Sequence, residues 1–205
     1  MTKIRLAAII LCAGKGTRMC SDVPKVLHPL AGRPMLSHLL STLSEIDLNH
    51  TTIVIGEDMS AVAEISRPHQ TVLQSNQLGT GHAVLAAREK LAEQGNDFPG
   101  DILVLFGADP LIEADTIARM IKTREESPKP AIVVLGFEAW DPGKYGRLIL
   151  ANDGTLEAIV EANNATQEQL DITLCNSGIM LIDGAHLWIL LERIKAANTE
   201  GEHYL

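Results

Sequence analysis

The chain has 205 residues and a formal net charge of −9, and 46% of its residues are hydrophobic while only 3% are aromatic. This length suits one domain of ordinary size with a core of aliphatic side chains. The acidic balance argues against nucleic acid or an anionic membrane as a partner, because both favour basic protein surfaces. Phosphate groups would therefore have to be bound locally.

The cysteines and the hydropathy pattern indicate the compartment. Cys12, Cys20 and Cys175 form no Cys-x-x-Cys pair, so neither a disulfide framework nor a zinc site is indicated. No apolar run approaches the roughly 20 residues that cross a bilayer. Residues 1–5 are basic and precede an apolar run, but no small-residue cleavage site follows, which argues against a signal peptide. We expect a cytoplasmic protein.

The first apolar run, residues 6–11, has the length and branching of a strand buried on both faces of a parallel sheet. Two glycines and three cations follow it: Gly14, Gly16, Lys15, Arg18 and Lys25. Glycine lets a backbone approach a ligand closely, and the cations neutralise phosphate. The spacing fits neither the dinucleotide fingerprint nor the P-loop. A surface turn with incidental charges is the alternative, but three cations in an acidic chain favour a phosphate-binding loop.

The next elements alternate between helix and strand. Pro34 suits the first turn of a helix that reaches residue 43, and strands are predicted over residues 51–56 and 70–74 with a short helix over 60–66 between them. This alternation predicts an α/β protein with a doubly wound, mostly parallel sheet.

The third strand opens into a polar turn before a helix predicted over residues 83–91. The turn contains Gln74, Gln77, Gly79 and Thr80. Two glutamines offer the donor and acceptor groups that the edge of a base requires, and the turn lies where ligands bind in open α/β sheets. The alternative is a polar turn with Thr80 as a helix cap. His82 alone is more typical of a structural residue.

A fourth strand, residues 101–106, precedes Gly107-Ala108-Asp109-Pro110. A carboxylate at this end of a strand can hold Mg²⁺, which takes oxygen ligands and bridges to phosphates. The alternative is that Asp109 caps a helix that begins with Pro110.

Five further elements are predicted: a helix over residues 116–126, a strand over 131–137, a late β-hairpin over 141–160, a strand over 172–182 and a helix over 187–197. The polar residues Asn176-Ser177-Gly178 interrupt the last strand, which suggests a bulge or the approach of a ligand.

The chain resembles the uridylyltransferase domain of bacterial N-acetylglucosamine-1-phosphate uridylyltransferases, within the sugar-phosphate nucleotidyltransferase family. Five motifs in order carry the resemblance: Leu-x-x-Gly-x-Gly-Thr-Arg-Met at 11–19 with Pro-Lys-Val-Leu at 24–27, Gln-x-x-Gln-Leu-Gly-Thr-Gly-His-Ala at 74–83, Tyr-Gly-Arg at 145–147, Ile-Val-Glu at 159–161 and Asn-Ser-Gly-Ile at 176–179. The resemblance implies a Rossmann-like nucleotidyltransferase domain over residues 1–205. It also implies transfer of a uridylyl group from UTP to N-acetylglucosamine-1-phosphate, without a protein nucleophile.

The resemblance assigns roles to residues that match its motifs. Uracil and its nucleoside would be held by Leu11, Cys12, Ala13, Gly14, Gln74, Gln77, Gly79 and Thr80. The triphosphate and the transferred group would be held by Arg18 and Lys25, and the amino sugar by Gly146, Glu161 and Asn176. Mg²⁺ would be held by Asp109.

The chain departs from the family in two respects. The family has Gly-Asp-x-Pro where this chain has Gly107-Ala108-Asp109-Pro110, so either a rearranged loop lets Asp109 bind Mg²⁺ or catalysis is impaired. The family's second metal ligand, an asparagine, and its left-handed β-helix acetyltransferase domain would lie beyond residue 205. We therefore expect a fragment or a shortened relative.

Two alternative functions stay open at this point. They are a non-catalytic sugar-nucleotide binding module, and a nucleotidyltransferase that acts on another small phosphate substrate. A homo-oligomer is also left open.

Overall fold

A computed structural model of the protein describes residues 5–14, 16, 19–93, 98, 100–194 and 203–205. The chain folds as two compact units, the first formed by Met1–Val133 with Leu181–Leu205 and the second by Val134–Met180. The single nucleotidyltransferase domain expected over residues 1–205 stays a prediction.

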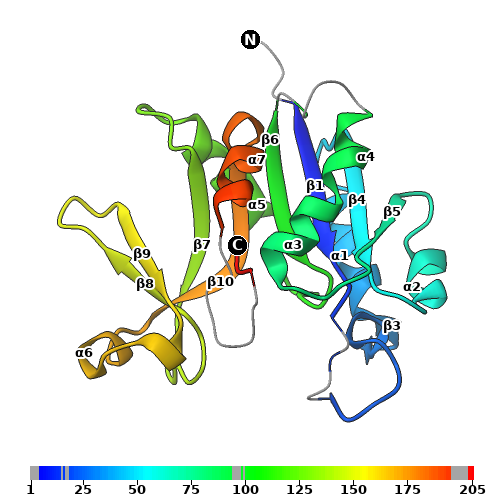
Figure 1. The fold of residues 1–205 in the computed structure, drawn as a ribbon, viewed down its shortest axis with the longest axis horizontal. Coiled ribbons are helices and arrows are strands. Elements are labelled where there is room, and N and C mark those ends of the chain that lie inside the picture. The colour runs from blue at the N-terminus through cyan, green and yellow to red at the C-terminus, as the bar shows by residue number, and fades with distance from the viewer. Residues whose placement is uncertain (1–4, 15, 17–18, 94–97, 99, 195–202) are drawn as a thin grey trace. The chain divides into compact units, whose positions relative to one another are not determined.

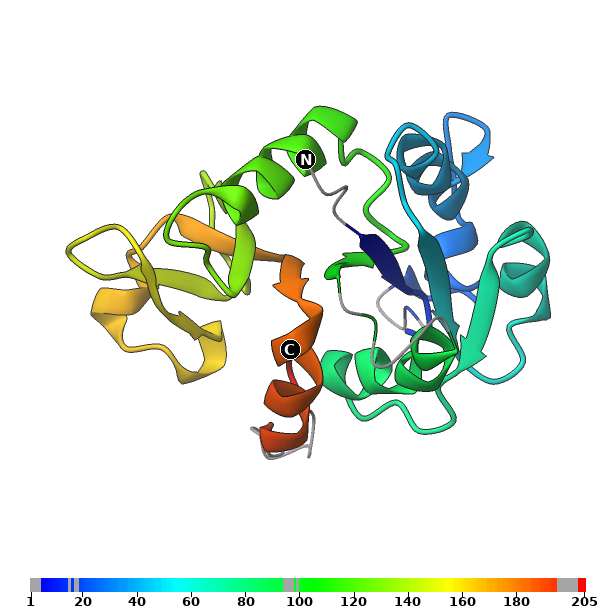
Figure 2. The ribbon, with the colours of Figure 1, turned by 90° about the horizontal axis from the view of Figure 1, so that it is seen from above.

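The first unit contains a largely parallel sheet with helices on both faces (Figures 1 and 2). Its strands are β1 (Leu6–Leu11), β4 (His50–Ile55), β5 (Gln70–Leu73) and β6 (Asp101–Phe106), in the order β5-β4-β1-β6 with β10 (Leu174–Asp183) beside β6. The pairs β1·β4, β1·β6 and β4·β5 are parallel. Every residue of β1 is buried, as expected of a central strand covered on both faces.

The helices of the first unit are α1 (Met35–Leu43), α2 (Ser60–Ile65), α3 (Thr80–Ala86), α4 (Arg88–Ala92), α5 (Ala114–Glu125) and α7 (Gly184–Arg193), with the short elements η2 (Lys25–Leu27), β2 (Pro29–Leu30) and β3 (Arg33–Pro34). Helix α1 buries Leu36, Leu39 and Leu43, a spacing that places them on one face. Figure 2 shows α1 on one side of the sheet and α3 and α4 on the other. The helix predicted over residues 83–91 is two helices, because a tighter turn at Ala87, whose N–H donates to the Val84 carbonyl, separates them.

The second unit contains β8 (Arg147–Leu150), β9 (Leu156–Val160), η3 (Ala162–Asn164), α6 (Gln167–Leu170) and most of β7 (Ile132–Glu138) and of β10. Strands β8 and β9 form the predicted antiparallel hairpin, β10 pairs antiparallel with β8, and β7 also pairs with β10. Strand β10 runs through the expected interruption, because the Ser177 hydroxyl donates to the Leu135 carbonyl and Gly178 takes a φ of +81°.

This architecture confirms the predicted α/β fold with a mostly parallel sheet and a late hairpin. No helix in the described part of the chain has the length and apolar content of a membrane span.

Candidate active site

The loop predicted to bind uracil leaves the carboxyl end of β1 and comprises Leu11, Cys12, Ala13 and Gly14. It is anchored on both sides, since the Cys12 N–H donates to the Val54 carbonyl (2.8 Å) and the Gly107 N–H donates to the Leu11 carbonyl (3.0 Å). Burial raises the pKa of the Cys12 thiol to about 12, so the thiol stays protonated at neutral pH and packs as a small apolar group. Gly14 is exposed, and a Cβ there would meet no described atom within 4 Å.

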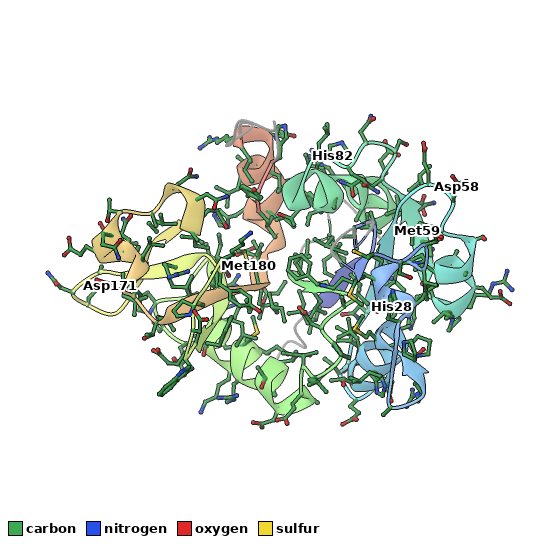
Figure 3. All side chains as sticks on the ribbon, turned by 90° about the horizontal axis from the view of Figure 1, so that it is seen from below. His28, Asp58, Met59, His82, Asp171 and Met180 are labelled. Atoms are coloured by element: carbon green, nitrogen blue, oxygen red, sulfur yellow. The ribbon has the colours of Figure 1, made fainter. Side chains whose placement is uncertain are left out.

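The glutamine turn lies beside this loop. Gln74 follows β5 and is buried, and its Nε2 donates to the Gly79 carbonyl (3.2 Å) and to Nδ1 of His82 (3.0 Å), which Figure 3 labels. Nε2 of Gln77 donates to the Ala13 carbonyl at 2.6 Å, across a separation of 64 residues. The two loops expected to hold uracil are therefore joined directly, at the ends of β1 and β5.

Gly56 makes room for this junction, and the sequence did not single it out. A Cβ at position 56 would lie 3.1 Å from the Ala13 carbonyl oxygen and 3.1 Å from Nε2 of Gln77, the two atoms of the bond that joins the loops. The available signal was a glycine at the end of the second strand, which is a common place for a ligand or another backbone to approach closely.

The positive charge of Lys25 acts on the carboxyl group of Asp109. Lys25 packs against Gly16, where a Cβ would lie 2.7 Å from Cβ of Lys25 and where φ is +62°. Burial raises the pKa of Asp109, and the positive charge of Lys25 acts in the opposite direction. A predicted phosphate-binding cation and the predicted metal ligand thus share one region. Arg18, the other predicted cation, lies outside the described residues.

Asp109 is the candidate ligand for a divalent cation. Within the turn 107–110 it is the only carboxylate, and its N–H donates to the Phe106 carbonyl (3.1 Å). The described residues contain no group of three or more His, Cys, Asp or Glu side chains that could hold a metal together. Mg²⁺ usually takes one or two carboxylates and completes its shell with water and phosphate oxygens, so one half-buried aspartate fits a site that substrate completes.

The three residues predicted to hold the amino sugar lie together in the second unit. The Asn176 N–H donates to the Gly146 carbonyl at 2.8 Å, and Oδ1 of Asn176 accepts from the Gly178 N–H at 2.8 Å. A Cβ at Gly146 would lie 3.2 Å from Oε1 of Glu161. Glycine at position 146 therefore leaves room for the Glu161 carboxylate, which is a good acceptor for sugar hydroxyls.

Arg147 organises the loop that carries Gly146. Its side chain is buried and donates to three backbone carbonyls, those of Tyr145, Gly143 (3.3 Å) and Leu170 (3.4 Å). A buried guanidinium spread over three carbonyls fixes the course of the loop, because each carbonyl would otherwise need another donor. The signal in the sequence was its place in the Tyr-Gly-Arg motif, but its role in the loop depends on contacts that the sequence does not specify.

Comparison with known proteins identifies the family of the chain. The family model described as "MobA-like NTP transferase domain" matches residues 8–173. The Bifunctional protein GlmU of Paramagnetospirillum magneticum is 51% identical over 205 residues, which is 100% of this chain and 44% of that protein. The GlmU of Rhodospirillum rubrum is also 51% identical with the same coverage, and that of Rhizorhabdus wittichii is 44% identical over 207 residues, 100% of this chain and 45% of that protein.

The chain thus spans less than half the length of these curated relatives. Among solved structures, UDP-glucose pyrophosphorylase complexed with UDP-glucose matches with a TM-score of 0.74 over 98% of this chain and 84% of that chain. At 18% sequence identity this match shows a shared fold alone. Because the family model covers most of the chain and the relatives align over all of it, the chain belongs to the MobA-like NTP transferase family of nucleotidyltransferases.

Proposed function

We propose that this chain transfers a uridylyl group from UTP to N-acetylglucosamine-1-phosphate, giving UDP-N-acetylglucosamine and pyrophosphate. The observation that carries the proposal is the Gln77–Ala13 hydrogen bond, which joins the two loops whose motifs are expected to hold uracil. The 51% identity to GlmU proteins over the full chain supports the choice of this reaction among those of the family.

The reaction needs positioning and charge neutralisation more than a reactive side chain. A phosphate oxygen of the sugar-1-phosphate attacks the α-phosphorus of UTP and forms the new P–O bond. The bond from the α-phosphorus to the bridging oxygen breaks, and that oxygen leaves with its electron pair in pyrophosphate. The glycine and glutamine loops would orient the base, Lys25 would neutralise phosphate charge, and Glu161 with Asn176 would hold the sugar.

A divalent cation, Mg²⁺ in our proposal, would neutralise phosphate charge when bound, and Asp109 would be its protein ligand. The residue before it, Ala108, has no oxygen to offer, so this chain presents one carboxylate displaced by one position from the family pattern. This displacement supports the second candidate function, a sugar-nucleotide binding module without turnover.

Pyrophosphate release with Mg²⁺, UTP and N-acetylglucosamine-1-phosphate tests the first candidate, with CTP, GTP and other sugar phosphates as comparisons. Release with the named pair above all others is the expected result. Calorimetric titration with UDP-N-acetylglucosamine tests the second candidate, for which binding without turnover is expected. Absence of both release and binding would remove both.

The variant Ala108→Asp tests whether the alanine at position 108 limits metal binding. If position 108 limits metal binding, this variant raises Mg²⁺-dependent release, whereas an unchanged rate counts against that explanation. A cytoplasmic location, a homo-oligomer and the lack of nucleic-acid or membrane partners stay predictions.

A further inference from the structure

The last three residues, His203–Leu205, lie against the end of the loop that precedes α3 and against the first residues of α3. The His203 N–H donates to the Leu78 carbonyl (2.7 Å), and the Gly81 N–H donates to the His203 carbonyl (2.8 Å). The Leu205 N–H donates to the Thr80 hydroxyl oxygen (2.9 Å). The 203–205 segment is thus hydrogen-bonded to three residues around the predicted nucleoside-binding pair Gly79 and Thr80, namely Leu78, Thr80 and Gly81.

The glycines of this loop leave space for the segment. Gly79 has a φ of +101°, and a Cβ there would lie 2.5 Å from the carbonyl oxygen and 2.7 Å from the nitrogen of His203. At Gly81 a Cβ would lie 3.2 Å from the same oxygen. The backbone that approaches these glycines is the chain's own, whereas the motif suggested the approach of a ligand.

The segment also completes the start of helix α3. The N-cap residue of α3 is Gly79, which has no side chain to accept a hydrogen bond from the first turn. The first N–H groups of a helix have no partners inside the helix. The His203 carbonyl accepts one of them, that of Gly81, and so does the work that a Ser or Asp cap performs elsewhere.

Thr80 keeps a group for a ligand despite this contact. A hydroxyl has one O–H donor and two acceptor lone pairs, and the Leu205 N–H occupies one lone pair. Within the part of the chain that the structure describes, no group accepts from the Thr80 O–H, so it can donate to a ligand. On its other side the loop is held by Gln74, whose Nε2 donates to the Gly79 carbonyl.

We propose that the 203–205 segment is a positioning element that holds residues 78–81 in the conformation that binds the nucleotide. This proposal rests on the proposed function. The segment raises nucleotide affinity by fixing the loop before binding, since a loop that is already ordered loses less entropy when a ligand binds. His203 and Leu205 act through Leu78, Thr80 and Gly81 and need no contact with substrate.

Two pairs of variants test it. His203→Pro removes the N–H that donates to Leu78, while His203→Ala keeps both backbone bonds and loses only the imidazole, whose Nδ1 lies 3.3 Å from the Ile194 carbonyl. Leu205→Pro removes the N–H that donates to Thr80, and Leu205→Ala keeps it. Hydrogen exchange at the Gly81 amide in the nucleotide-free protein measures order in the loop, and calorimetry measures affinity for UTP and for N-acetylglucosamine-1-phosphate separately.

Each proline variant should raise Gly81 exchange and weaken UTP binding by about five- to tenfold, the effect of one net hydrogen bond, with sugar-phosphate affinity unchanged. The alanine variants should match the unaltered protein. Faster exchange in both proline variants with unchanged UTP affinity would overturn the proposal, as would unchanged exchange in both. If the unaltered protein binds no UTP, the proposed function fails, and exchange at Gly81 still decides whether the segment orders the loop.

Discussion

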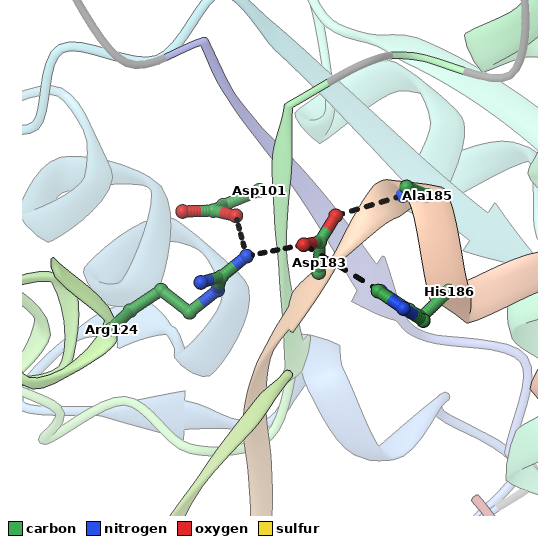
Figure 4. Close-up of polar contacts among 5 residues, drawn as sticks. All are labelled: Asp101, Arg124, Asp183, Ala185 and His186. Carbon is green, nitrogen blue, oxygen red and sulfur yellow. Dashed lines mark hydrogen bonds and ion pairs between the residues drawn. The ribbon is translucent and has the colours of Figure 1, made fainter. Parts of the chain in front are cut away.

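Arg124 is the residue whose removal should destabilise the first unit most clearly. Its Nη2 lies 3.0 Å from Oδ1 of Asp101 in β6 and 2.6 Å from Oδ2 of Asp183, the N-cap residue of α7 (Figure 4). The Arg124 side chain is 3% exposed, and those of Asp101 and Asp183 are 8% and 29% exposed. One guanidinium thus joins α5, β6 and the start of α7.

Arg124→Met should lower the free energy of unfolding by about 3 kcal/mol. Removing one partner of a buried ion pair costs roughly 3–5 kcal/mol because the other charge stays buried, and we take the lower end since Asp183 is partly solvated. Urea denaturation measures the change. Arg119→Met on the same helix is the matched control, because Arg119 pairs with Asp115 at 3.5 Å with both side chains exposed, and it should cost about 0.5 kcal/mol or less. Equal costs for the two variants would refute the reasoning.

The loss of stability caused by Arg124→Met should also depend on pH. Burial raises the pKa of Asp101, and the charge of Arg124 acts against that rise. When folding raises the pKa of a carboxyl, the free energy of unfolding of the protein falls as the pH rises from the unfolded-state pKa through the folded-state pKa. Without Arg124 the folded pKa rises further, so the destabilisation by Arg124→Met should shrink as pH falls from neutral toward about 4. Adding Asp101→Asn should remove most of that pH dependence, and a penalty that does not change with pH would contradict this account.

Four further outcomes are expected. Gly107→Ala should lower the free energy of unfolding by about 1–3 kcal/mol, because its Cβ would lie 2.3 Å from Sγ of Cys12, and Cys12→Ala should restore most of that loss in the double variant. A thiol reagent should label Cys20, which is exposed, well before the two buried cysteines, with their labelling gated by unfolding. Gly14→Ala should leave the melting temperature unchanged and weaken UTP binding in calorimetry, since its Cβ meets no described atom. Arg147→Met should cost about 2–4 kcal/mol in urea denaturation by leaving three carbonyls without their donor.

The sheet could be predicted from the sequence because its signal is local. Apolar runs such as residues 101–106 are typical of strands covered on both faces of a parallel sheet, and the observed strand β6 has the predicted bounds. The strand through residues 176–178 was harder, since three polar residues indicate an interruption. In the structure the Ser177 hydroxyl donates a hydrogen bond to the Leu135 carbonyl, and the strand continues through these residues.

For the candidate site, the sequence indicates residue types and does not specify the contacts between them. Gln74 and Gln77 were expected to bind a base, but that Gln77 donates to Ala13 depends on a pairing across 64 residues that no local pattern specifies. The sequence does not single out Gly56 for the same reason, because the role of this glycine is to leave space for that hydrogen bond. Local sequence predicts which groups face an edge of the sheet, whereas long-range geometry decides which of them contact each other.

The glycines near the candidate site also depend on long-range contacts. At Gly16, Gly79, Gly107 and Gly146, a Cβ would crowd Lys25, His203, Cys12 and Glu161 respectively. Each of these glycines admits a group of the chain itself, and three of those groups are predicted site residues: Cys12 and Lys25 for the nucleotide, and Glu161 for the sugar. Gly14 differs, because its Cβ would enter space free of described atoms. The glycines that admit Lys25 and Glu161 are therefore distinct from Gly14, which leaves open space, and among these glycines only Gly14 should affect ligand binding without affecting stability.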